Sequence, residues 1–226
     1  KKADASRIYG LELEHILSPH SMNFLVYKDT LIEEHIAGIP GDDFIRDVLP
    51  NCTELEKSQI AKEFIKFKER CLVRLLGDMR SYNYVITPTH DFDQIIYKIR
   101  AIDFDQQSFE GNLKVYNLQF MKENFKMIEM VGKKLQNDSI RQYKIEERSF
   151  MAKRMITAPR RTARLIKCMK ADTISFPENV ALLKKQLVKY VGDVKFKDCK
   201  NMGEILETIL AFVKRNYLDI SNKELF

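Results

Sequence analysis

Three side chains that carry oxygen ligands stand in an order that suits phosphoryl-transfer chemistry. Asp78 and Asn83 are five positions apart, and Asp103 follows within Ile102-Asp103-Phe104-Asp105. This chemistry requires an aspartate that takes the proton of the attacking hydroxyl, together with carboxamide and carboxylate oxygens that bind Mg²⁺. Asp78 has the residue type required for the first role, and Asn83 and Asp103 have the types required for the second.

The helix that leads to Asp78 is well marked in the sequence. Thr53-Glu54-Leu55-Glu56 has the pattern of a capping box, which opens a helix. After it, apolar residues recur at steps of three and four, which predicts one buried helical face. They are Ile60, Phe64, Phe67, Cys71 and Leu75. A long buried helix is therefore expected to run directly into Gly77-Asp78.

A hairpin is expected to bring the other two residues together. Tyr84 to Thr87 and Ile95 to Phe104 have the composition of strands, and Pro88 to Gln94 has that of the turn between them. The open end of an antiparallel hairpin places its first and last residues side by side. Asn83 and Asp103 should therefore share one metal site.

These segments resemble the catalytic elements of the protein-kinase-like superfamily. Gly77 to Asn83 is similar to the kinase loop H-R-D-x-x-x-x-N. It is closer to the H-G-D-x-x-x-x-N that precedes I-D-F-D in aminoglycoside phosphotransferases, choline kinases and HipA-type kinases. The sequence departs from this pattern at Leu76, where the family has histidine, and in the longer interval between Asp78 and Asp103.

The resemblance implies an ATP- and Mg²⁺-dependent phosphotransferase that moves the γ-phosphate to a hydroxyl of a protein or small-molecule acceptor. Asp78 would orient that hydroxyl, and Asn83 and Asp103 would bind Mg²⁺. Arg80 stands where related kinases carry a lysine and would contact the transferred phosphate. Because the loop histidine and a glycine-rich loop are absent, the alternative of a pseudokinase that binds a nucleotide or a partner as a scaffold stays open.

The implied fold is α+β and protein-kinase-like, with a mostly helical C-terminal lobe, a catalytic β-hairpin and the remnant of an N-terminal β lobe. Residues 1–38 would form the end of the small lobe, with a helix over Ile8 to Leu17 and strands over Asn23 to Tyr27 and Thr30 to Ile36. Residues 39–226 would form the large lobe.

Two features of the small lobe are implied in the same way. The hinge, which pairs with adenine through its backbone, would comprise Glu34, His35 and Ile36. Glu12 or Glu14 would be the helix glutamate that pairs with a nucleotide-contacting lysine.

The resemblance implies that this lysine stands on a strand before the helix. Lys1 or Lys2 could end it, although their spacing to Glu14 is short. The sequence also lacks an initiator methionine and a glycine-rich loop, and we therefore expect it to start partway into a domain.

Beyond Gly111 the periodicity and end signals predict helices almost throughout. We expect them near residues 114–135, 139–171 with a break around Pro159, 177–191 and 202–217.

Composition places the chain among intracellular proteins that bury a core. The chain has 226 residues and 45% hydrophobic content, enough for one large domain or two small ones. The four cysteines are far apart and form no C-x-x-C motif, which favours reduced thiols over a zinc site or disulfides. No apolar run approaches the ~20 residues of a membrane span. We expect a cytoplasmic protein.

The charge is divided unevenly along the chain. Residues 1–110 hold 14 Lys and Arg against 19 Asp and Glu, whereas residues 111–226 hold 24 against 13. The basic second half favours an acidic, phosphorylated or protein acceptor over a polycation. Residues 133–170 alone carry a net charge of +9. This segment could bind nucleic acid, or it could be a solvated helix surface, and both interpretations stay open.

Overall fold

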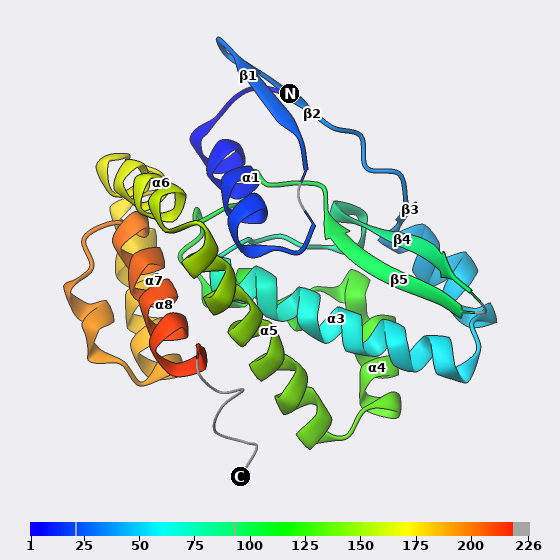
Figure 1. Ribbon diagram of the computed structural model, residues 1–226. Helices are drawn as coiled ribbons and strands as arrows, with labels where there is room; N and C mark the ends of the chain where they lie inside the picture. The colour runs from blue at the N-terminus through cyan, green and yellow to red at the C-terminus, as the bar shows by residue number, and fades with distance from the viewer. Residues whose placement is uncertain (21, 93, 219–226) are drawn as a thin grey trace.

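The computed structural model describes residues 1–20, 22–92 and 94–218, and these form a largely helical α+β fold with two small antiparallel sheets (Figure 1). The helices are α1 Ala5–Leu17, α2 Gly41–Asp43, α3 Glu54–Arg74, α4 Phe125–Lys134, α5 Asn137–Thr157, α6 Pro159–Ala171, α7 Pro177–Val191 and α8 Met202–Tyr217. The strands are β1 Phe24–Tyr27, β2 Thr30–Glu33, β3 Ile39–Pro40, β4 Tyr84–Asp91 and β5 Gln94–Ala101.

Helix α3 runs through the middle of the molecule, as its sequence predicts. The capping box is present, because Thr53 N–H donates to Glu56 Oε2 at 2.7 Å and Glu56 N–H donates to Thr53 Oγ1 at 3.3 Å. The apolar face of α3 is buried, and the helix packs against α4, α5, α8 and β5. It ends at Leu75, whose backbone turns into the left-handed region with φ 59°. The chain therefore leaves the core of the protein at the Gly77-Asp78 loop.

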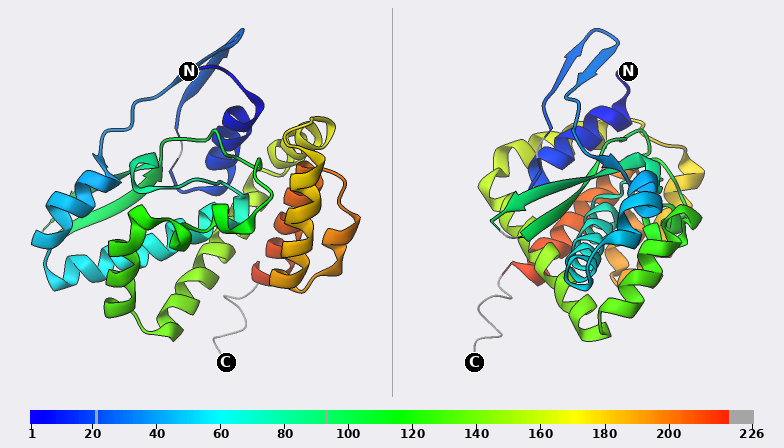
Figure 2. Two further views of the ribbon diagram at one scale, coloured as in Figure 1. Left: turned by 180° about the vertical axis from the view of Figure 1, so that it is seen from behind. Right: turned by 90° about the vertical axis from the view of Figure 1, so that its right-hand side faces the viewer.

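The hairpin β1–β2 stands above the helical part of the molecule in every view (Figures 1 and 2). Its tight turn is at Lys28-Asp29, where Lys28 has φ 51°. The first residues of the chain extend this hairpin, since Leu31 N–H donates to Lys1 O at 2.9 Å and Lys2 forms a bridge with Thr30. Lys1 is therefore held beside β2 by backbone hydrogen bonds.

Helix α1 packs against α5 and α6 of the large helical region. The buried Glu14 carboxylate pairs with the buried Arg74 guanidinium of α3. Arg154 of α5 donates to the carbonyl oxygens of Ile16 at 2.9 Å and His15 at 2.7 Å. These contacts tie the N-terminal segment to the helices that follow.

The second sheet has the order β3-β4-β5, and Tyr84 pairs with Ala101 at its inner end. The predicted turn over Pro88 to Gln94 is wrong, because β4 continues through Pro88 to Asp91. Strand β3 pairs only with Val85 and Ile86, which leaves the outer edge of β4 open further along. A proline without an N–H group is tolerated at such an edge. The hairpin is therefore longer than expected, and its tip carries the fully exposed Phe92.

The predicted helix near 114–135 is wrong in its first half. Three 3₁₀ turns, Leu113–Tyr116, Leu118–Phe120 and Lys122–Asn124, precede α4. The Asn112 and Asn117 side chains accept from backbone N–H groups two residues ahead, which favours turns over a continuous helix. The helices predicted further along are confirmed, including the break at Pro159 and the bounds of α7 and α8.

Within the described ranges, no helix combines the length and apolar character needed to cross a bilayer.

Candidate active site

The Asp78 loop is held between two segments that lie far along the chain. Gly77 N–H donates to Gln106 O, and Asp78 N–H donates to Val115 O, both at 3.2 Å. The loop passes so close to these neighbours that a Cβ at position 77 would lie 3.0 Å from Val115 Cγ1 and 3.2 Å from Gln106 O. Asp78 itself has φ 54°, a strained value for a residue with a side chain. The partly exposed Asp78 carboxylate is therefore placed by its surroundings.

Gln107 braces this loop from the inside. Its fully buried side-chain amide donates to the carbonyl oxygens of Arg74 and Leu75, and Ser108 N–H donates to Leu75 O at 2.8 Å. Leu76, which replaces the histidine of the kinase pattern, is also buried. Bracing of the loop is thus supplied by Gln107, a residue that the sequence analysis did not identify.

Arg80 contacts Asp78 directly. Arg80 Nε donates to Asp78 Oδ1 at 2.8 Å, and its Nη1 lies 3.4 Å from Glu123 Oε1. The guanidinium is half-exposed, so it can exchange these partners for a bound anion.

Asn83 connects the loop to the end of β5. The side-chain Nδ2 of Asn83 donates to Asp78 O at 2.7 Å. The backbone carbonyl oxygen of Asn83 accepts from Ile102 N–H at 3.0 Å. Because the side-chain nitrogen of Asn83 makes the first bond, the side-chain oxygen Oδ1 is not used in it. Oδ1 is also the Asn83 side-chain atom that could bind magnesium, since magnesium prefers oxygen ligands. The hairpin therefore brings Asn83 next to the residue that precedes Asp103, as the sequence predicts.

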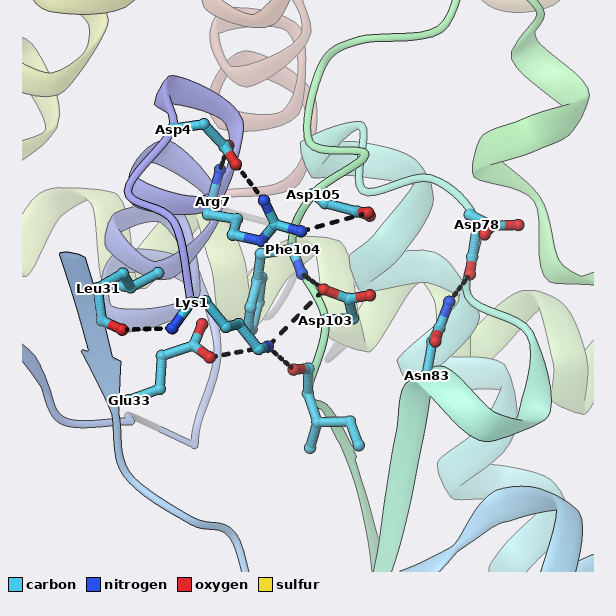
Figure 3. A network of polar contacts seen from close by, with 11 residues as sticks. Lys1, Asp4, Arg7, Leu31, Glu33, Asp78, Asn83, Asp103, Phe104 and Asp105 are labelled. Carbon is cyan, nitrogen blue, oxygen red and sulfur yellow. Dashed lines mark hydrogen bonds and ion pairs between the residues drawn. The ribbon is translucent and has the colours of Figure 1, made fainter. Parts of the chain in front are cut away.

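Asp103 faces Lys1, one of the two lysines that the sequence offers for the nucleotide-contacting role. Lys1 Nζ lies 3.8 Å from Asp103 Oδ1 and 2.8 Å from Glu33 Oε2, and it donates to Ile102 O at 3.2 Å. In Figure 3 the Asp103 carboxylate lies between Lys1 on one side and Asp78 with Asn83 on the other. In the sequence, the position of Lys1 before α1 was the only indication that it could belong to the site. No sequence signal indicated that Glu33 would pair with it.

The glutamates expected to pair with such a lysine have other partners. Glu14 pairs with Arg74 in the core, and Glu12 pairs with Arg161 at 2.8 Å. Both carboxylates face the helical region, because α1 packs against α5 and α6. Glu33 on β2 takes the position opposite Lys1 instead.

The pKa of Asp105, which lies two residues after Asp103, is raised in the protein. Burial raises the pKa of Asp105, and the carboxylates of Asp103 and Asp78 raise it further, whereas Arg7 lowers it. Arg7 lies 3.6 Å from Asp105. Each of the three carboxylates also faces a cationic side chain, since Lys1 lies near Asp103 and Arg80 is paired with Asp78.

The donor set fits magnesium in a site completed by phosphate. The described residues hold no group of three His, Cys, Asp or Glu side chains arranged for a metal ion. Mg²⁺ usually keeps several waters and takes one or two carboxylates plus substrate phosphates, so it does not need such a group. The partly exposed Asp103 carboxylate and Asn83 Oδ1 are oxygen ligands of the required kind.

The expected hinge is an extended segment between β2 and β3. Glu34 N–H donates to Asn23 O at 2.9 Å, so this group is satisfied within the hairpin. Ile36 is buried, and His35 is exposed. Backbone contacts with adenine at Glu34, His35 and Ile36 therefore stay a prediction, with the Glu34 N–H already in use.

Several basic side chains of the segment 133–170 bind partners within the protein. Arg148 pairs with Glu69, and Arg161 pairs with Glu12. Arg154 binds backbone carbonyl groups of α1. These pairings use part of the positive charge of the segment within the protein, and they favour the interpretation of a helix surface over that of a nucleic-acid site.

No family model, no curated protein and no solved structure matches this chain.

Proposed function

We propose that this protein is an ATP- and Mg²⁺-dependent phosphotransferase. The observation that carries the proposal is the convergence of Lys1, Asp78 and Asp103 from three separate segments, linked through Asn83 and Ile102. A lysine, a loop aspartate and a carboxylate that follows a strand are the groups that phosphoryl transfer requires.

Each of these residues would have a defined role. Asp78 orients the acceptor hydroxyl and takes its proton, and Arg80 leaves Asp78 to bind the oxygens of the transferred phosphate. Lys1 binds the phosphates of the nucleotide from the side of β2, and Glu33 holds the lysine in place. Asp103 and Asn83 would hold Mg²⁺, which neutralises phosphate charge when it is bound.

The arrangement of the segments supports this proposal. A hairpin of the small sheet lies above a helical region, and the Asp78 loop and the Asp103 segment lie between them (Figures 1 and 3). The brace from Gln107 also removes one reason to regard the loop as degenerate, because it replaces the missing histidine.

One observation favours a pseudokinase as the second candidate. Arg80 Nε is bonded to Asp78 Oδ1, one of the two carboxylate oxygens that could receive the acceptor proton. A protein in which this ion pair never opens would bind nucleotide without turnover.

The two candidates are separated by one pair of measurements. For the wild-type protein, Mg²⁺-ATP at one hundred times its Kd should stabilise the fold by about 2.7 kcal/mol, and ADP should be released over time. Asp78→Asn should keep the stabilisation and lose ADP release. Stabilisation without ADP release in the wild-type protein would indicate the pseudokinase. If Mg²⁺-ATP produced no stabilisation, the phosphotransferase and the nucleotide-binding pseudokinase would both be excluded.

A further inference from the structure

A pocket of about 590 Å³ opens beside Asp78. It is formed by the catalytic loop and by the three 3₁₀ turns that precede α4. Its lining consists of Asp78, Arg80, Lys114, Val115, Phe120, Met121, Lys122 and Glu123. Because Asp78 and Arg80 belong to this lining, a molecule bound there can present a hydroxyl group to the candidate base.

The turns that form the pocket are fixed to the catalytic loop. Val115 O accepts from Asp78 N–H at 3.2 Å. The buried Asn124 donates to Met79 O at 3.0 Å and accepts from the Tyr84 hydroxyl at 2.9 Å. The side chains at positions 114 to 123 are therefore held at a constant place relative to Asp78.

The pocket contains two lysines whose charge is not compensated. Arg80 forms ion pairs with both Asp78 and Glu123, so these three side chains compensate one another's charge in part. Over the described part of the chain, Lys114 and Lys122 form no ion pair with a carboxylate. Lys114 Nζ lies 5.4 Å from the centroid of the Phe120 ring, and Lys122 is exposed. An anionic group would therefore be attracted to the outer part of the pocket.

The remaining lining is apolar, with Val115, Met121 and the half-exposed Phe120. The volume lies within the range that small-molecule sites occupy, and a few charged groups on an apolar wall are typical of such sites. A polycationic acceptor would be repelled by both lysines.

We propose that the phosphate acceptor is a small alcohol that carries a phosphate or carboxylate group, bound by Lys114 and Lys122 with its hydroxyl at Asp78. The proposal rests on the proposed phosphotransferase function. The acceptor oxygen bonds to the γ-phosphorus of ATP, the bond from that phosphorus to the β-phosphate oxygen breaks, and ADP leaves with the bonding electron pair. The hydroxyl proton passes to the Asp78 carboxylate.

Acceptors that differ only in their charge test this proposal. The first set is glycerol, glycerate and glycerol 3-phosphate, and the second is ribose and ribose 5-phosphate, with a serine-containing peptide as the macromolecular alternative. We expect kcat/KM to be at least about tenfold higher for an anionic member than for its neutral partner. Glycerate and glycerol 3-phosphate distinguish the carboxylate from the phosphate.

The double variant Lys114→Ala with Lys122→Ala should raise KM for the anionic acceptor by about tenfold or more and leave kcat nearly unchanged. Inorganic phosphate alone should raise the Tm of the wild-type protein more than that of the double variant, which gives a readout without turnover. Lys189→Ala is the matched control, since this exposed lysine of α7 lies outside the pocket lining.

Preference for a neutral alcohol or for the peptide would overturn the proposal. Equal phosphate-induced shifts in Tm for the wild-type protein and the double variant would also overturn it. This outcome counts against the proposal even if no acceptor is phosphorylated. Failure of the phosphotransferase proposal is recognised separately, because the wild-type protein would then not turn over Mg²⁺-ATP, whether or not Mg²⁺-ATP stabilises the fold.

Discussion

Lys1 Nζ lies 3.8 Å from Asp103 Oδ1, although Lys1 lies next to β2, Asp103 follows β5, and the two residues stand far apart in the sequence. Lys1 reaches this place because its backbone pairs with Leu31 and its ammonium group is held at 2.8 Å by Glu33. The contact joins the β1–β2 hairpin to the Asp78–Asp103 region and gives the site a cation that no motif in the sequence specifies.

Removal of the Lys1 charge should impair nucleotide turnover while the fold persists. Lys1→Met should lower kcat/KM for ATP by roughly 10²-fold, as the loss of one preorganised charged donor does in other enzymes. Lys2→Met is the control, because alternate residues of a strand point to opposite faces. ADP release measures the effect. Equal losses in the two variants would show that Lys1 has no special role.

Asp103 should be required for the effect of magnesium. Asp103→Ala removes a carboxylate oxygen from the proposed metal site, so Mg²⁺ should no longer increase ATP binding and turnover should fall by roughly 10³-fold. Asp91→Ala, at the exposed end of the β4–β5 hairpin, should behave as the wild-type protein does. Magnesium titration with ATP binding as the readout checks this. Full magnesium dependence in Asp103→Ala would exclude the metal assignment.

The buried pair Glu14–Arg74 should matter to stability more than an exposed pair does. The side chains are 7% and 2% exposed, so Glu14→Gln leaves a buried guanidinium without its counter-charge. We expect a loss of about 3–5 kcal/mol in the free energy of unfolding. Glu129→Gln breaks the exposed pair with Lys133, which solvent screens, and should change the stability far less. Urea denaturation of both variants compares them, and similar losses would contradict the prediction.

His20 should make the stability depend on pH below neutrality. Burial, with a contribution from Arg70, lowers the pKa of His20 to about 4, whereas histidine in an unfolded chain titrates near 6.5. Between these values the unfolded chain binds a proton that the native protein does not. The contribution of His20 to the free energy of unfolding is therefore fully present above about pH 6.5. It is lost as the pH falls towards 4, by about 2–3 kcal/mol.

Comparison of the wild-type protein with His20→Gln isolates this contribution. Urea unfolding at pH 4.5, 5.5 and 7 should show a steeper loss of stability on acidification for the wild-type protein. Parallel curves for the two proteins would show that His20 does not titrate in this way.

Elements with strong local signals could be predicted closely. The capping box at Thr53, the proline at 159 and the apolar periodicity of α8 each act within a few residues, so the bounds of these helices follow from the sequence. The length of β4 could not be predicted in this way. Its continuation through Pro88 depends on where β3 stops pairing, which is a property of the sheet.

The sequence by itself determined which chemical groups are available, namely the aspartates, the asparagine and their order along a helix, a loop and a hairpin. Only the tertiary structure decided which groups meet. Glu14 faces Arg74 in the core, Glu33 faces Lys1, and Gln107 braces the Asp78 loop, because packing between distant segments selects the face on which each side chain lies. Such contacts join segments far apart in the chain, so no local pattern could specify them.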